Sequence, residues 1–303
     1  MSALRIAWRV SRLESLMVLG AGLVLLAASI LFALLLNGVN PGCIDVGSEQ
    51  GCFDRRYFDL AYYAEGFQVA YWVFPGAAGA LLGVLVAGRE VETGTAQFSW
   101  SLALSRSRWL LERSIATVLP LLGILVCLAV TSQLVWAAAH PGLSPEASLS
   151  GFGARGASVI VRGIFVYCVA VLVGAIIGRV LPAFLVAAAV IVPLTLFGVG
   201  LGTLGMTPQA LEVSSSGRIS GDPLVLDERY RAPDGALVSW EEMAALAPPD
   251  VDAGEWVYDH RVAIGISGTR YPEVLLREIA WLGAFSAASS IVALGVVRRR
   301  RPR

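Results

Sequence analysis

The chain contains no lysine, and its basic side chains are arginine apart from two histidines. A nucleotide-binding P-loop needs a lysine at the phosphates, so this chain cannot supply one. Any ATP-driven activity would therefore depend on a second polypeptide. The formal net charge is zero, and we predict no nucleic-acid partner.

Residues that hold metals or catalyse hydrolysis are also scarce. The two histidines, His140 and His260, lie far apart, and the sequence has neither an HExxH motif nor a paired Cys/His spacing that suits zinc. The segment Gly265-Ile266-Ser267-Gly268 lacks the spacing of a nucleophile elbow. The sequence therefore disfavours a membrane hydrolase, and we predict no catalytic residue, no metal site and no cofactor in this chain.

Charged residues make up only 15% of the 303 residues, whereas 56% are hydrophobic. Several apolar runs approach the roughly 20 residues that a helix needs to cross a bilayer. We therefore predict an all-α, polytopic membrane protein. Its six predicted spans cover about 16–36, 68–88, 114–138, 159–178, 181–204 and 279–297.

Arginine in the short flanking segments predicts the orientation, because such residues accumulate on the cytoplasmic side. The basic side chains of one face are Arg5, Arg9, Arg12, Arg89, Arg106, Arg108, Arg113, Arg179 and the cluster 298–301. The other face has Arg55, Arg56 and Arg155, beside more acids. We therefore expect both termini in the cytoplasm of a bacterial cell, with the protein in its plasma membrane.

Three segments outside the spans have distinct compositions. Residues 1–15 alternate arginines with Leu4 and Trp8, which fits either an amphipathic helix on the cytoplasmic leaflet or a basic flank that only sets orientation. Residues 205–273 are acidic and are expected to form a small extracellular cap. Within this cap Asp234-Gly235 predicts a turn, and Ser239-x-x-Glu242 predicts a helix that begins with a capping box. Residues 274–303 hold the sixth span and the basic tail.

The four cysteines fall into two groups. Cys127 and Cys168 lie inside apolar runs and are expected to be small core residues. Cys43 and Cys52 flank a short polar segment in the first outer loop, where a disulfide is expected in an oxidising compartment. Two free thiols are the alternative.

The polar stretch 89–113 lies between the second and third spans and is rich in arginine. It begins with an acidic and threonine-rich segment, and it ends with arginines. This composition predicts a short amphipathic helix at the cytoplasmic face, available to another protein. A solvated loop that only connects two spans is the alternative.

Two features inside the spans also favour particular contacts. Gly76, Gly79 and Gly83 repeat at short helical spacings, which allows close helix packing within the chain or between two copies. Arg162 and Glu278 lie near the outer ends of the fourth and sixth spans. Because charge is costly in lipid, we predict that the two face the protein interior and pair; the alternative is that both reach the outer interface.

Taken together, these motifs resemble the type-2 membrane-domain permeases of ATP-binding-cassette exporters, particularly the small six-span actinobacterial kind. The resemblance rests on Arg89-Glu90-Val91-Glu92-Thr93-Gly94-Thr95 followed by Leu104-Ser105-Arg106-Ser107-Arg108-Trp109. It also rests on Asp234-Gly235 with Val238-Ser239-x-x-Glu242, and on Tyr271-Pro272 through Glu278 to the arginine tail. The cysteine-flanked loop departs from the family pattern.

The resemblance implies a permease that pairs with a separately encoded ATPase, in two copies each. The second permease would be this chain or a related one, and ATP and Mg would be bound by the ATPase. The segment between spans two and three would be the coupling helix. Its implied coupling residues are Glu90, Glu92, Thr93, Gly94, Thr95, Arg106 and Arg108, of which the basic ones would contact membrane lipid.

The resemblance also implies a substrate path between two protomers, lined by spans two and five. The residues expected there are Phe74, Gly76, Gly79, Pro193, Phe197 and Gly200. The leading hypothesis is multidrug-type export of a hydrophobic or amphipathic compound such as a drug, an antibiotic or a lipid. The alternative is a non-transporting sensor or assembly subunit whose acidic extracellular cap binds a ligand or a partner.

Overall fold

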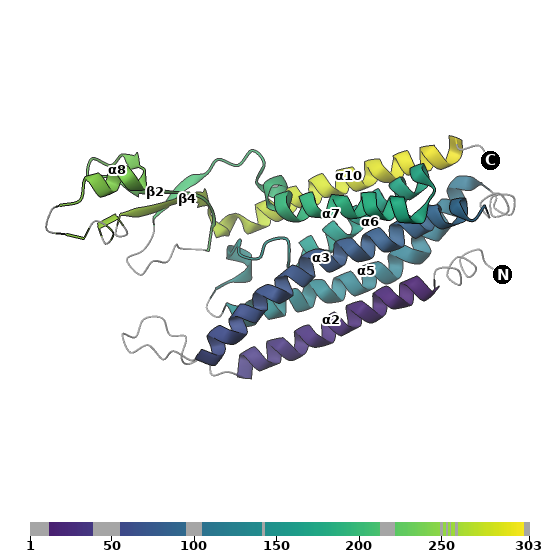
Figure 1. Cartoon of the computed structure of the whole chain (residues 1–303), viewed down its shortest axis with the longest axis horizontal. Coiled ribbons are helices and arrows are strands. Elements are labelled where there is room, and N and C mark those ends of the chain that lie inside the picture. The colour runs from purple at the N-terminus through teal and green to yellow at the C-terminus, as the bar shows by residue number, and fades with distance from the viewer. Residues whose placement is uncertain are drawn as a thin grey trace. The chain divides into compact units, whose positions relative to one another are not determined.

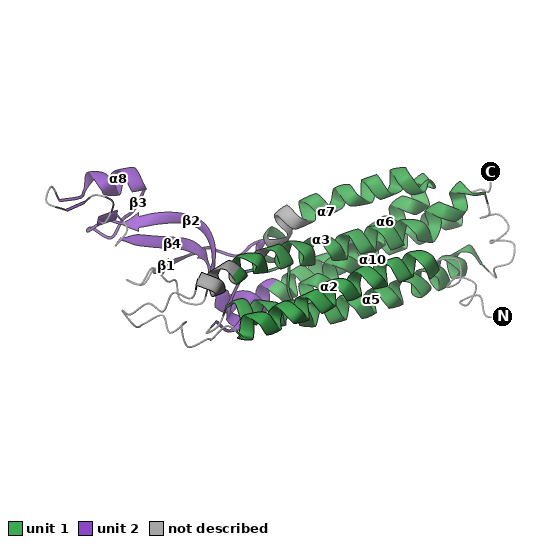
Figure 2. Cartoon of the chain, turned by 60° about the horizontal axis from the view of Figure 1, so that its bottom comes forward, with its two compact units in different colours: residues 1–141, 151–202, 275–303 green, residues 142–150, 203–274 purple. Residues whose placement is uncertain are grey.

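The structure is a computed structural model, and the part of the chain that it describes has several gaps. Its described residues are 12–38, 55–94, 105–140, 143–212, 222–248, 251–252, 254, 256–257 and 260–299. Within these ranges the side chains of 55–59, 61, 65, 191, 195–199 and 212 are not described. The described residues form two compact units, coloured separately in Figure 2.

The first unit comprises 1–141, 151–202 and 275–303 and is helical. Its helices are α2 (Arg12–Gly38), α3 (Arg55–Glu92), α5 (Arg106–Ala139), α6 (Ala157–Ile177), α7 (Val180–Thr203) and most of α10 (Tyr271–Arg299). α2, α3 and α5 run alongside one another in Figures 1 and 2. In the described part of the chain, five helices are long and apolar enough to cross a membrane, which makes this a multi-pass membrane protein.

α3 packs most extensively against α6, and glycines make this close approach possible. A Cβ atom added to Gly79 would lie 2.5 Å from the backbone oxygen of Gly163, and one added to Gly83 would lie 2.5 Å from that of Tyr167. Both distances are too short for any side chain. The small residues of α3 therefore serve helix packing within the chain.

Two hydroxyl pairs join α5 to its neighbours inside this core. The Tyr71 hydroxyl donates to Thr131 Oγ1 at 3.2 Å, linking α3 to α5. The hydroxyls of Thr117 and Tyr167 lie 2.7 Å apart and link α5 to α6. All four side chains are buried, so each pair satisfies polar groups that lipid could not.

The second unit comprises 142–150 and 203–274 and contains a four-stranded antiparallel sheet of strand order β1-β4-β2-β3. The strands are β1 (Gln209–Glu212), β2 (Leu224–Arg231), β3 (Leu237–Val238) and β4 (Arg261–Ile266). In the β2–β3 hairpin Gly235 has φ +84°, and the amide of Ala236 donates to Asp234 Oδ1 at 2.9 Å. Helix α8 (Trp240–Ala245) follows β3.

The prediction of an all-α chain is wrong for the second unit. β4 lies in the centre of the sheet and is rich in β-branched residues, which favour strands. Its partners β1 and β2 come from much earlier in the sequence. The turn at Asp234-Gly235 predicts short extended pieces on either side, and β2 and β3 confirm them. The acidic composition of the region says nothing about the long-range pairing of β4, which was not predicted.

The predicted spans differ from the helices at several ends. α3 begins at Arg55, thirteen residues before the predicted start at 68, because the tyrosine-rich segment before the apolar run is helical. α7 is also apolar, but its uninterrupted described stretch, Val180–Leu194, is shorter than the other five. A sixth span therefore stays a prediction. Most of the predicted helix at 1–15 lies outside the described residues, which begin at Arg12 within α2.

Candidate coupling site

The polar stretch 89–113 is divided between the ends of two long helices. α3 continues to Glu92, after which Thr93 and Gly94 form a turn in which Gly94 has φ +71°. α5 begins at Arg106 and is capped by Ser105, whose hydroxyl accepts from the backbone N–H of Arg108. Residues 95–104, including Thr95, lie outside the described part. The described acidic and basic segments are thus the ends of two helices.

The last turn of α3 is joined by ion pairs to two other helices. Arg89 donates to Glu14 of α2, with 2.5 Å between Nη1 and Oε1. The next residue, Glu90, pairs with Arg113 of α5. Arg113 and Glu90 are almost completely buried, with side chains only 5% and 10% exposed. A buried pair of this kind is far more costly to break than one at a surface.

Glu92 adds a third connection from the same turn. Its Oε2 accepts a hydrogen bond of 2.8 Å from the backbone N–H of Val180, the first residue of α7. A carboxylate at a helix N-terminus is favoured by the helix dipole and by the unpaired N–H groups of the first turn. Three charged residues on one turn of α3 therefore contact α2, α5 and α7.

The two predicted arginines lie at the start of α5. Arg106 Nη1 approaches the backbone oxygen of Arg298 in α10 at 3.5 Å. Arg108 forms an i,i+4 ion pair with Glu112 at 2.8 Å and is largely exposed. The exposed pair contributes at most about 1 kcal/mol to stability, so Arg108 remains available to other groups.

A small pocket lies beside these ion pairs, between α2, α3 and α5. It is lined by Glu14, Arg89, Arg113, Thr117, Leu82, Leu85 and Val86. Two acids and two arginines converge here once Glu90 is included, so the cluster is balanced in charge. The two ion pairs connect the ends of α2, α3 and α5, because opposite charges from different helices attract one another.

The predicted path residues of span two are enclosed within the helical unit. Phe74 is half-buried and lies against the core formed by α2, α3, α5 and α6, and Gly76 and Gly79 are buried. Gly79 faces α6 as described above. The structure therefore places these residues in intramolecular packing.

The predicted path residues of span five lie in α7. Pro193 and Gly200 are exposed, whereas the side chain of Phe197 lies outside the described part. That the two groups line one path between two protomers stays a prediction of the resemblance.

At the other end of the unit, the structure brings Arg162 and Glu278 together. Arg162 Nε and Nη2 lie 2.7 and 2.6 Å from Glu278 Oε1, and Ser158 donates to Glu278 Oε2 at 2.6 Å. Their side chains are 4% and 0% exposed. Gly153, with φ +89°, lies directly against the guanidinium group. α6, α10 and the loop before α6 therefore meet at one buried ion pair.

Sequence reasoning did not identify Glu14, Ser158 or the buried arginine Arg155 as site residues. Glu14 is the only acid among the first 44 residues. A single acid near several arginines could have been predicted to form an ion pair. Ser158 and Arg155 had no such signal, because their roles depend on how the loop before α6 folds back. Cys43 and Cys52 lie outside the described residues, so their predicted disulfide is not tested. Cys127 and Cys168 are free thiols; Cys168 packs against the core, but Cys127 is exposed, so its prediction as a core residue is wrong.

Comparison with known proteins gives one family. Residues 13–200, more than half of the chain, match the family described as "ABC-2 membrane transporter related". The matched region runs from the start of α2 into α7 and includes every ion pair of the last turn of α3. No curated protein and no solved structure matches the chain.

Proposed function

The chain belongs to the ABC-2 membrane transporter related family, and we propose that it is the permease subunit of an ATP-binding-cassette exporter. Membership implies a membrane component of such a transporter that works with an ATPase. The permease would export a hydrophobic or amphipathic substrate. The separately encoded ATPase, in two copies, would bind ATP and Mg.

The observation that carries the proposal is the anchoring of the last turn of α3. Arg89, Glu90 and Glu92 contact three different helices. A force applied to the segment that follows Glu92 would therefore reach α2, α5 and α7 at once. This is the property that a coupling element needs, because ATP binding by a partner must bias the arrangement of several spans together.

The exposed part of this region is the docking surface in our proposal. Thr93 and Gly94 are exposed and follow the anchored turn directly. Thr95 and residues 96–104 follow in the sequence up to Ser105 and would belong to the same docking surface. Arg106 and Arg108 would lie at the level of the phospholipid headgroups. The termini would share this cytoplasmic side of the bacterial plasma membrane, and the second unit would face outward.

Transport would use a dimer with a second copy of this chain or a related permease. α3 and α7 would then line the path, with Pro193 and Gly200 contributed by the exposed face of α7. Two arrangements of the spans, open to either side, would be biased by ATP binding and hydrolysis in the partner.

The test is co-purification of the chain with the products of neighbouring reading frames, followed by an ATPase assay. We expect an ATPase to accompany the chain, and Thr93→Arg to abolish this because a bulky cation would occupy the docking surface. Thr93 suits the purpose better than Glu90, since Glu90→Arg would place a second cation against buried Arg113 and disrupt the fold.

Thr207→Arg is the matched control, because Thr207 is also exposed but lies in the second unit. A complex that survives Thr93→Arg would move the contact to another surface. If no ATPase accompanies the chain at all, the sensor or assembly hypothesis becomes the better one.

A further inference from the structure

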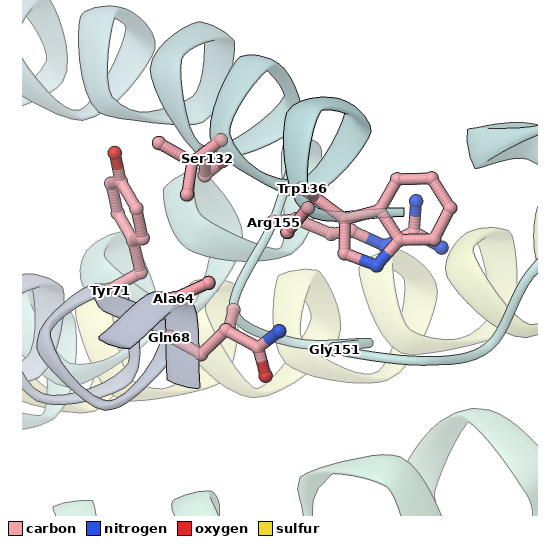
Figure 3. Close-up of a pocket in the computed structure, with 10 residues that line it drawn as sticks. Ala64, Gln68, Tyr71, Ser132, Trp136, Gly151 and Arg155 are labelled. Carbon is pink, nitrogen blue, oxygen red and sulfur yellow. The ribbon is translucent and has the colours of Figure 1, made fainter. Parts of the chain in front are cut away.

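Two small pockets lie beside α3, one toward each end of this helix. The pocket near its start, drawn in Figure 3, is lined by Ala64, Gln68, Tyr71, Ser132, Val135, Trp136, Ala139, Gly151, Ala154 and Arg155. Ser132 and Tyr71 already donate to other residues, and Arg155 donates to Gln133. The indole N–H of Trp136 lacks an acceptor among the described residues, but one neutral donor does not specify a ligand.

The pocket near the other end of α3, beside the ion pairs, differs in its polar atoms. Glu14 of α2 and Arg113 of α5 both line it. In the described part of the chain, Glu14 Oε2 and Arg113 Nε are shielded from solvent and have no hydrogen-bond partner. Each residue already uses another atom in an ion pair, Glu14 with Arg89 and Arg113 with Glu90. A buried ion pair is stable only if the remaining lone pairs and protons also find partners.

The two unpaired atoms have complementary roles, since a carboxylate oxygen accepts and the Nε–H of arginine donates. Glu14 and Arg113 are close enough for their charges to interact. A molecule that accepts from Arg113 and donates to Glu14 would satisfy both atoms. Thr117 offers a third contact in the same pocket. Its hydroxyl donates to the backbone oxygen of Arg113 at 3.2 Å, and its oxygen can still accept.

The charge and the size of the pocket select the ligand. The cluster consists of two acids and two arginines, so neither a cation nor an anion is needed to balance it. Leu82, Leu85 and Val86 form the apolar part of the wall. The free space that remains is about enough for one water molecule. Water donates two hydrogen bonds and accepts two, which matches the groups around it.

We propose that this pocket binds one ordered water molecule, which accepts from Arg113 Nε and donates to Glu14 Oε2 and to Thr117 Oγ1. Arg89–Glu14 joins α2 to α3, and Glu90–Arg113 joins α3 to α5. The water completes the ring, because it joins α2 to α5. The site rests on these contacts alone, so it goes beyond the proposed export function and does not depend on it.

The experiment is radiolytic footprinting of the purified full chain in lipid nanodiscs. A short X-ray pulse converts water, including bound water, into hydroxyl radicals that oxidise adjacent side chains, and mass spectrometry measures the rate at each residue. Leu82 lines the pocket and is 1% exposed, whereas Leu125 of α5 is 0% exposed and lines neither pocket. We expect Leu82 to be oxidised several-fold faster than Leu125. Equal rates would show a dry pocket and overturn the proposal.

Two variants test whether Glu14 holds the water. Glu14→Leu removes the acceptor, and the oxidation rate of Leu82 should fall toward that of Leu125. Glu14→Gln keeps a side-chain oxygen and should retain most of the oxidation. Glu112→Leu is the matched control, because Glu112 also pairs with an arginine but does not line the pocket. If Glu14→Leu and Glu112→Leu give the same rate at Leu82, Glu14 does not bind the water and the proposal is wrong.

The comparison of Leu82 with Leu125 in the unchanged chain needs no variant, so it tests the site even if Glu14→Leu does not fold. Elution of each variant at the wild-type position in gel filtration confirms that folding is intact. Because no ATPase takes part, loss of the water site would leave the export function standing. An absent ATPase partner would likewise leave the water site standing.

Discussion

The ion pairs of this protein differ most in how deeply they are buried. Arg162–Glu278 joins α6 to α10 with side chains only 4% and 0% exposed, whereas Arg270–Glu273 lies at 29% and 42%. A surface pair contributes about 0–1 kcal/mol, but breaking a buried pair costs about 3–5 kcal/mol because one charge is left unpaired in a medium of low polarity.

We therefore predict that Glu278→Gln destabilises the protein by about 3–5 kcal/mol. Glu273→Gln, on the same helix, is the control and should cost about 1 kcal/mol or less. Denaturation in detergent, followed by intrinsic fluorescence, measures both. The double variant Arg162→Met/Glu278→Leu should regain most of the lost stability. If Glu278→Gln behaves like Glu273→Gln, the buried pair does not hold α6 to α10.

A second residue-scale prediction concerns the capping box of α8. The backbone N–H of Ser239 donates to Glu242 Oε2 at 2.8 Å, and the N–H of Glu242 donates to Ser239 Oγ. The backbone hydrogen bond from Ser239 lowers the pKa of Glu242 below its usual value. Because the pKa of Glu242 is lower in the folded than in the unfolded protein, its carboxylate stabilises the folded state at every pH above the unfolded-state pKa. This stabilisation is lost as the pH falls through the pKa of Glu242 in the folded protein.

Ser239→Ala should raise the exchange rates of the first amides of α8 about fivefold at neutral pH, since a helix cap is lost. At a pH below the lowered pKa of Glu242 the difference between variant and wild type should shrink. Hydrogen exchange with mass spectrometry measures both. Ser144→Ala is the control, because Ser144 caps the short helix η2 (Pro145–Ala147) without a side-chain hydrogen bond. No difference between the two variants at neutral pH would contradict the role of the capping box.

At the scale of the helices, the packing of α3 on α6 depends on a glycine. In Gly79→Ala the added methyl would meet the backbone of Gly163 and Tyr167, neither of which can move as a side chain does. Overpacking of this kind costs about 1–3 kcal/mol, and we expect a loss in that range. Gly66→Ala, also in α3 but with nothing within 4 Å of the added atom, should be neutral or stabilising. Thermal unfolding in detergent compares them, and equal midpoints would contradict the close α3–α6 contact.

The helices and strands also show which elements could be predicted from the sequence and which could not. Apolar runs of sufficient length predicted the helices α2, α5 and α6, because in lipid length and polarity largely decide the structure. The early start of α3 at Arg55 was missed, since the residues before the apolar run are polar but still helical. The hairpin of β2 and β3 could be expected from the turn at Asp234-Gly235, whereas the rest of the sheet was missed because β4 pairs with strands distant in sequence.

The candidate site divides in the same way. Charged residues near the ends of apolar runs, such as Glu90, Arg162 and Glu278, could be recognised because charge next to lipid is costly. The ion-pair partner of such a residue could be predicted only where the sequence offered a single other charge near a span end, as for Arg162 and Glu278. The pairing of Glu90 with Arg113 depends on α3 and α5 lying side by side, and the polar stretch gave several arginines to choose from.

For the whole molecule, the arginine distribution predicts which face lies in the cytoplasm. The coupling proposal requires the loop after α3 to be on that face, because an ATPase that uses cellular ATP can dock only there. By the predicted order of the spans, the second unit is then expected to face outward. This requirement can be tested without knowing the substrate or the partner.

We predict opposite accessibility for two exposed positions, Ser105 at the start of α5 and Thr207 in the second unit. Each is replaced by cysteine in a chain whose four native cysteines are changed to alanine. A membrane-impermeant maleimide should label Thr207→Cys in intact cells but Ser105→Cys only after permeabilisation. The reverse pattern would place the anchored turn of α3 outside the cell, where it could not meet an ATPase. The ion pairs of α3 would then be structural only, and the acidic unit would be the part available to cytoplasmic partners.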